Sequence, residues 1–142
     1  MEEDLVARVK EGRRRRELAD QAGFVRGRHF TEWSNHLDRL RSEGRDSEAL
    51  PLLFEIIEAT ERAAAITETG PPPGWTKRAA IILRRLGDRD GEMEVLRRYA
   101  AACPLGRGSQ ALLGRLAKLA GERDARDRST AAPATGSVGL AP

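Results

Sequence analysis

Cysteine and aromatic residues are both scarce in this sequence of 142 residues. Cys103 is the only cysteine, so no internal disulfide can form and a structural zinc cluster built from cysteines is excluded. Aromatic residues make up 4% of the chain, so leucine, isoleucine, valine and alanine must supply the core. Such a core suits close packing of helices, whereas sheets favour β-branched and aromatic residues. The composition therefore predicts an all-α fold.

Long apolar runs are also missing. No stretch approaches the length of a membrane-spanning helix, and the acidic residues at positions 2–4 are the opposite of the basic start of a signal peptide. We therefore expect a cytoplasmic protein without membrane contact. Charged residues make up 33% of the chain, but the net charge is only +3. Arginine supplies most of the 25 basic residues, which together with abundant alanine and glycine is typical of a GC-rich genome and is weak evidence for phosphate binding.

The chain divides into three segments. Residues 1–28 predict a charged N-terminal helix or arm, because residues 4–22 carry few apolar positions and the next six residues are rich in glycine and arginine. Residues 29–120 carry strong helical patterns and predict the folded domain. Residues 121–142 mix aspartate with arginine and then become rich in alanine, threonine, proline and glycine. That composition predicts a disordered tail.

Four helices are predicted in two pairs within the central segment. We expect Thr31 to cap the first helix and Gly44 to end it, and Asp46 to cap the second. After a linker of three prolines, a third helix is predicted over residues 75–86. Gly87 ends this helix, and an aspartate that follows it caps the fourth. Each pair is therefore a helical hairpin closed by a glycine turn.

The two hairpins repeat each other at an offset of 43 residues. The matched positions are Leu37, Leu40, Gly44, Leu50, Leu53 and Ile57 in the first unit and Ala80, Leu83, Gly87, Met93, Leu96 and Ala100 in the second. A repeat of this size indicates stacked helical hairpins.

These residues resemble the tetratricopeptide repeat, whose pattern has a bulky residue, apolar residues at fixed spacings, a turn glycine and a Glu-Ala-Leu run. The first unit matches the pattern from Trp33 to Leu50. The second unit departs from it at Thr76, where a bulky residue is expected, and at Glu92, where a small buried residue is expected. The resemblance implies a short solenoid of stacked antiparallel hairpins that binds a protein or peptide.

More loosely, residues 28–105 are similar to helical segments in proteins of Gram-positive bacteria with high GC content. In some of those proteins the segment follows a nucleic-acid-related domain such as HIRAN. This sequence contains no such domain, so the function is not carried over.

No constellation of acid, base and nucleophile is visible in the sequence, so we expect a non-catalytic protein without a cofactor or metal. His29 and His36 are interpreted as structural or surface residues, and Cys103 as a small packed hydrophobe. Glu92 and two nearby aspartates miss the spacing of a calcium loop. We interpret these three carboxylates as helix caps.

The leading functional hypothesis is a protein-interaction or scaffold module of the helical-repeat type. In such modules the first helix of each hairpin lines a concave face that holds a peptide or helix. The predicted contact residues on these helices are Asn35, Arg39, Lys77, Arg78 and Arg85, with Trp75 as a partly exposed contact. An acidic peptide suits this set of side chains.

A fifth helix is predicted over residues 109–120, with a stripe of leucines on one face. Two interpretations of this stripe stand side by side. The helix either caps the second hairpin, or it forms a homodimer with Leu112, Leu116 and Leu119 in the seam.

The sharpest cluster of positive charge consists of Arg13, Arg14, Arg15 and Arg16. Four consecutive residues point around most of a helix, so these arginines do not form one docking stripe. A solvated helix is the simpler interpretation. The alternative function is a nucleic-acid-associated accessory protein that uses this Arg-rich segment.

Overall fold

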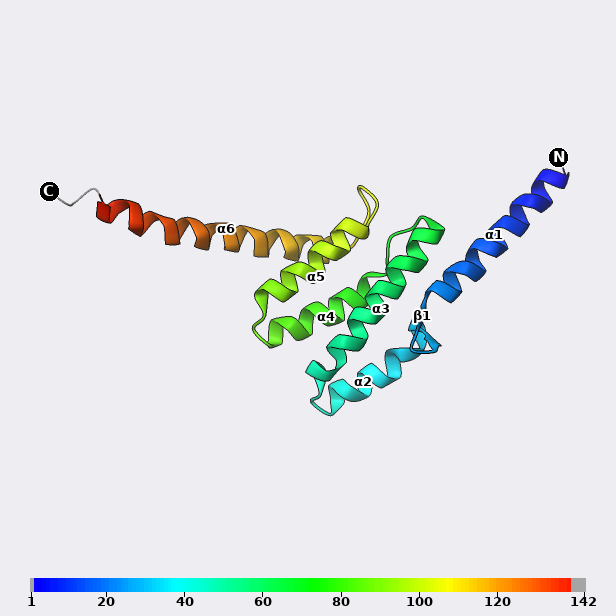
Figure 1. Ribbon diagram of the computed structural model, residues 1–142, viewed down its shortest axis with the longest axis horizontal. Coiled ribbons are helices and arrows are strands. Elements are labelled where there is room, and N and C mark those ends of the chain that lie inside the picture. Colours follow the sequence, from blue (N-terminus) through cyan, green and yellow to red (C-terminus); the bar gives the residue numbers. More distant parts are fainter. Residues whose placement is uncertain (1, 139–142) are drawn as a thin grey trace.

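The computed structural model describes residues 2–138 (Figure 1). Within them the chain forms six α-helices, a short antiparallel strand pair and one 3₁₀ helix. The helices are α1 (Glu2–Ala22), α2 (Ser34–Ser42), α3 (Asp46–Thr67), α4 (Pro73–Arg85), α5 (Arg89–Ala102) and α6 (Gln110–Val138). The strands β1 (Phe24–Val25) and β2 (Arg28–His29) and the 3₁₀ helix η1 (Phe30–Trp33) connect α1 to α2. The predicted all-α fold is confirmed.

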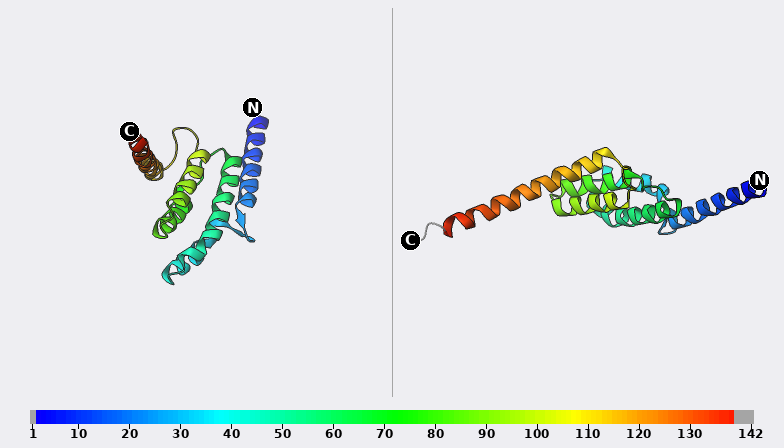
Figure 2. Two further views of the ribbon diagram at one scale, coloured as in Figure 1. Left: turned by 60° about the vertical axis from the view of Figure 1, so that its left-hand side comes forward. Right: turned by 90° about the horizontal axis from the view of Figure 1, so that it is seen from above.

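From α2 onward each helix packs against the next one in the chain, and α1 packs against α3 (Figures 1 and 2). The N-terminal part of α1 and the C-terminal part of α6 project from opposite ends of this body. The core lies between the central helices, where Leu53, Ile56 and Leu96 are almost completely buried. Tetratricopeptide-like stacking of the hairpins stays a prediction.

The two hairpin turns are built in the same way, as the repeat predicts. Gly44 and Gly87 have φ angles of +70° and +75°, a left-handed conformation that side chains with a Cβ rarely adopt. Arg45, which follows Gly44, donates its N–H to the carbonyl of Leu40 at 2.8 Å. In the same way Asp88, which follows Gly87, donates to the carbonyl of Leu83 at 2.9 Å. This bond is typical of the Schellman motif at helix ends.

Most of the repeated inward positions are buried. The buried ones are Leu37, Leu40, Leu53 and Ile57 in the first hairpin and Ala80, Leu83, Met93 and Leu96 in the second. Leu50 and Ala100 are half-buried. Leu86, the last residue of the predicted third helix, is 56% exposed and follows the end of α4 at Arg85.

The entry into the first hairpin differs from the prediction. Thr31 caps no α-helix and instead lies inside η1, where the side chain of His29 accepts a hydrogen bond from the Thr31 N–H. Asp46 is the first residue of α3 and makes no capping hydrogen bond. Its carboxylate pairs with Arg85 on α4 at 2.8 Å, so a contact between hairpins replaces the expected local cap.

The segment after residue 120, expected to be disordered, continues as helix α6 to Val138. Opposite charges spaced four residues apart, such as Glu122 with Arg126 and Asp124 with Arg128, favour a helix here. Residues 139–142 of the predicted tail lie outside the described residues. Among the described helices, none has the length and apolar content needed to cross a membrane.

The substitution Gly87→Ala tests the repeated turn. A Cβ in left-handed backbone costs about 1–2 kcal/mol, so we expect the free energy of unfolding to fall by that amount. Gly114 is the matched control, because it lies inside α6 with open space where a Cβ would project. There, alanine should raise stability by up to about 1 kcal/mol. Chemical denaturation measures both variants, and changes of the same sign would contradict the assignment.

Candidate peptide-binding face

One face of α4 is basic from Lys77 to the C-terminal end of the helix. Lys77, Arg78, Ile81, Arg84 and Arg85 follow the spacing i, i+1, i+4, i+7, i+8, which places them on the same side of a helix. The helix contains no acidic residue. Its opposite side is buried in the core. We call these five residues the α4 face.

A groove lies between the α4 face and the first hairpin, which α2 and α3 form. Its lining consists of Leu37, Arg41, Asp46, Ala49, Leu53, Arg78, Ile81, Ile82 and Arg85. Two ion pairs cross from α4 to the first hairpin, Arg78 to Asp38 at 2.9 Å and Arg85 to Asp46 at 2.8 Å. The volume of this α2/α4 groove is about 90 Å³. Cofactor sites have volumes of about 300–1,000 Å³, so this space fits a single side chain.

A second groove lies between the α4 face and α6. Its lining consists of Pro73, Gly74, Lys77, Ala80, Ile81, Arg84, Leu96, Ser109, Ala111, Leu112 and Arg115. Three of these residues are basic and none is acidic, while most of the others are apolar. The volume of this α4/α6 groove is about 330 Å³. Ile81 is the one residue that lines both grooves.

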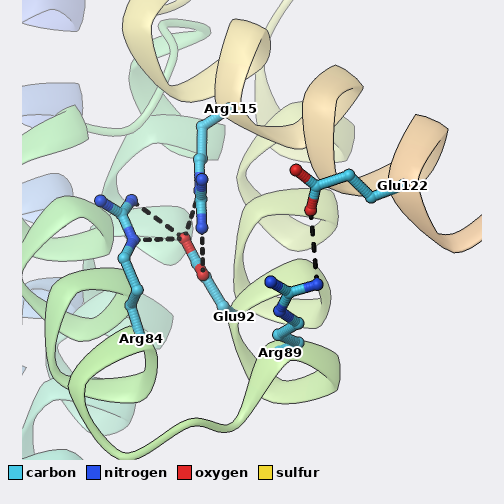
Figure 3. Close-up of polar contacts among 5 residues, drawn as sticks. All are labelled: Arg84, Arg89, Glu92, Arg115 and Glu122. Atoms are coloured by element: carbon cyan, nitrogen blue, oxygen red, sulfur yellow. Dashed lines mark hydrogen bonds and ion pairs between the residues drawn. The ribbon is translucent and has the colours of Figure 1, made fainter.

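The wall of the α4/α6 groove is held by the carboxylate of Glu92, which is completely buried on α5 (Figure 3). Arg115 on α6 donates from Nε and Nη2 to the two carboxylate oxygens, at 2.9 and 3.1 Å. Arg84 on α4 donates from Nε and Nη2 to Oε2, at 3.2 and 3.0 Å. We call these three residues the Glu92 clamp. It joins three helices through one side chain.

The clamp keeps Glu92 ionised. Burial by itself raises the pKa of this carboxyl, but the hydrogen bonds from Arg115 and Arg84 outweigh burial and hold the pKa below its ordinary value. The same contact raises the pKa of Arg115. Two guanidinium groups share one carboxylate, so the clamp leaves one uncompensated positive charge beside the groove. Arg84 and Arg115 are 50% and 24% exposed, and an incoming ligand can reach them.

A second ion pair supports the same junction. Arg89 on α5 lies 3.5 Å from Glu122 on α6, about two helical turns beyond Arg115 (Figure 3). No buried side-chain nitrogen or oxygen in the described part of the chain lacks a hydrogen-bond partner. The polar groups between α5 and α6 are therefore fully satisfied.

The structure brings together half of the predicted contact residues. Lys77, Arg78 and Arg85 lie on the α4 face, whereas Asn35 and Arg39 are exposed on α2 but line neither groove.

Trp75, the predicted partly exposed contact, is half-buried and packs against the core. Its ring is 6.1 Å from that of Phe30, and the Arg78 guanidinium lies 5.8 Å from its centroid. Trp75 therefore supports the start of α4 and positions Arg78.

Sequence reasoning missed Ile81, Arg84 and Arg115, and it misread Glu92. Only one of the three supposed caps performs that role, since the Asp88 carboxylate accepts from the Gly91 N–H at 2.8 Å. Glu92 is a buried ion-pair partner, and its interpretation as a cap was wrong. The position of Glu92 in the repeat, where a small buried residue is expected, could have shown that this carboxylate is buried. The helical spacing of the basic residues in α4 could have shown that Arg84 belongs to the same face as Lys77.

The leucine stripe of α6 packs within the chain. Leu112 and Leu119 are 6% and 1% exposed, and Leu116 is partly buried against the same core. The interpretation of these residues as a dimer seam is corrected, because α5 already covers them. The interpretation of the helix as a cap on the second hairpin agrees with these contacts.

The other residues considered in the sequence analysis line neither groove. All four arginines at positions 13–16 are exposed on α1, and Arg15 pairs with Glu11 at 3.6 Å. His36 is exposed and its ring contacts Trp33 edge-on. Cys103 is half-buried at the end of α5, next to the core.

Comparisons of this chain with protein-family models, with curated proteins and with solved structures each find no match. A function can therefore be proposed only from the geometry and charge of the grooves.

The substitution Glu92→Gln tests the clamp. Removing one charge from a buried ion pair costs about 3–5 kcal/mol, and the exposure of Arg84 reduces this to about 1–3 kcal/mol of unfolding free energy. Glu94→Gln on the exposed side of α5 is the matched control and should change stability by less than about 0.5 kcal/mol.

The cost of Glu92→Gln should depend on pH in a defined direction. The pKa of Glu92 is lower in the folded chain than in the unfolded chain. The stability that Glu92 contributes is therefore fully present above the unfolded pKa of about 4.3. The contribution is lost as pH falls through the folded pKa. Denaturation curves should show a constant difference between the wild type and the variant near neutral pH and a shrinking one below about pH 4.3. A difference that grows on acidification would contradict the clamp.

Proposed function

We propose that this chain is a non-catalytic protein-interaction module that binds an acidic segment of a partner protein in the α4/α6 groove. The observation that supports the proposal is the lining of this groove, with three cations, no carboxylate and a largely apolar floor.

The charge of the groove favours carboxylate side chains. Lys77 is exposed and forms no ion pair among the described residues, while Arg84 and Arg115 share the single negative charge of Glu92. Guanidinium groups bind carboxylates through paired N–H donors, and this geometry suits aspartate or glutamate. The α2/α4 groove is less suited, because Asp46 lies in its lining and Asp38 neutralises Arg78 at its edge.

The apolar part of the groove favours a peptide over a nucleic acid. Ile81, Ala80 and Leu112 lie between the cations. A phosphate backbone makes its contacts with basic and polar groups and leaves such a floor unused. A segment that alternates acidic and apolar side chains uses both parts of the lining. The expected ligand is therefore an acidic, amphipathic segment of a protein.

Binding of a labelled peptide of alternating glutamate and leucine tests the proposal, with a glutamine–leucine peptide as the matched probe. Lys77→Glu should weaken binding of the acidic peptide by about fivefold or more, because it places a carboxylate beside the ligand. Arg97→Glu makes the same change of charge on an exposed site of α5 outside both grooves and should have little effect. Fluorescence anisotropy at low and high salt measures each affinity.

Ile81→Ala distinguishes binding in the groove from a general attraction of anions to the basic surface. It removes apolar contact and leaves every charge in place, so the acidic peptide should bind more weakly while a short DNA duplex should not be affected. Equal binding of the two peptides, or equal effects of Lys77→Glu and Arg97→Glu, would contradict the proposal.

A further inference from the structure

The two arginines of the Glu92 clamp carry more hydrogen-bond donors than Glu92 takes up. A guanidinium group has five N–H donors, and Arg84 and Arg115 each give two of them to Glu92. This leaves three donors on each side chain, and no other acceptor among the described residues binds them. In Figure 3 the third nitrogen of Arg84 points away from Glu92. The clamp thus presents free donors at the wall of the α4/α6 groove.

Glu92 does not face a ligand in this groove. Its carboxylate is completely buried and is not part of the groove lining, whereas Arg84 and Arg115 both line the groove. The two guanidinium groups therefore separate this negative charge from an incoming anion. Lys77 adds a third positive charge on the same side of α4, about two helical turns before Arg84. Three positive charges against one buried negative charge leave a surplus of two at this groove.

The first turns of two helices line the same groove. Pro73 and Gly74 begin α4, and Ser109 and Ala111 lie at the start of α6. The N–H groups at the start of a helix carry partial positive charge and favour an anion. Among the described residues, no side chain caps the start of α4 through a hydrogen bond. The backbone therefore adds to the positive potential of the three side chains.

We propose that the acidic residue recognised at the clamp is a phosphorylated serine or threonine of the partner segment, an inference that rests on the proposed binding of an acidic segment in this groove. A phosphoryl group has three terminal oxygens and a charge of about −1.5 to −2 at pH 7. A carboxylate has two oxygens and a single charge. The phosphoryl group therefore engages more of the free donors on Arg84 and Arg115, and its charge matches the positive surplus of the groove.

Other sources of phosphate use the groove less fully. Each phosphodiester of a nucleic acid carries one negative charge and has two unbridged oxygens, so it engages the clamp no better than a carboxylate does. Inorganic phosphate has the charge of the monoester but leaves Ile81 and Leu112 without a partner. A phosphorylated peptide places its phosphoryl group at the clamp and its flanking apolar side chains on these two residues.

Three peptides that differ at one central position test the proposal. The position holds phosphoserine, glutamate or serine within the same glutamate–leucine sequence, and fluorescence anisotropy measures binding to the full chain. The phosphoserine peptide should bind about tenfold or more tightly than the glutamate peptide, because both its charge and its oxygens favour the clamp. Inorganic phosphate and a short DNA duplex serve as unlabelled competitors. Each should displace the phosphoserine peptide only at a concentration about tenfold or more above that of the unlabelled peptide.

Two variants connect the preference for phosphoserine to the clamp. Arg84→Lys keeps the positive charge but removes the forked N–H groups, so it should remove most of the preference for phosphoserine over glutamate. Arg97→Lys makes the same substitution on an exposed site of α5 outside both grooves and should leave the preference unchanged. Lys77→Gln leaves the clamp intact and should weaken binding of phosphoserine by a larger factor than binding of glutamate, because a doubly charged group interacts more strongly with a cation. Circular dichroism checks that each variant stays folded.

The possible outcomes separate this inference from the proposed function. Equal affinity for the phosphoserine and glutamate peptides overturns the inference and leaves the proposed function intact, whereas failure of all three peptides to bind overturns both. A preference for phosphoserine that Arg84→Lys and Lys77→Gln leave unchanged places the phosphoryl group outside the clamp and overturns the inference. Inorganic phosphate or the DNA duplex binding as tightly as the phosphoserine peptide overturns it as well, because the ligand is then free phosphate or nucleic acid.

Discussion

The buried carboxylate of Glu92 is the constraint on which the second half of the structure depends. A charge that is completely shielded from water is unfavourable unless hydrogen bonds replace its hydration, and here two arginines from different helices supply them. Arg84 and Arg115 must therefore stay close to α5, and this requirement fixes α6 against α4. Because two guanidinium groups serve one carboxylate, the contact that holds the helices also leaves positive charge at the edge of the groove. Structure and charge of the proposed site have the same origin.

The inner side of α4 packs in the core, and its outer side forms the proposed binding surface. The inner side carries Ala79 and Ala80, which are 0% and 2% exposed and let the neighbouring helices approach closely. The outer side carries basic residues whose long side chains cover the grooves. Ile81 lies where these sides meet and touches both grooves. A helix with this arrangement is held firmly by its neighbours while its charged side chains stay accessible to a ligand.

The features that were predictable from the sequence are local. Gly44 and Gly87 end helices through their own backbone conformation, and the apolar spacing around them identifies the buried sides of both hairpins. The Glu92 clamp was not predictable in the same way, because its partners are 8 and 23 residues away on two other helices, and only the packing of those helices brings them to Glu92. The leucine stripe of α6 shows the same limit. Its apolar face is evident in the sequence, but only the fold shows that α5 covers it and no second copy is required there.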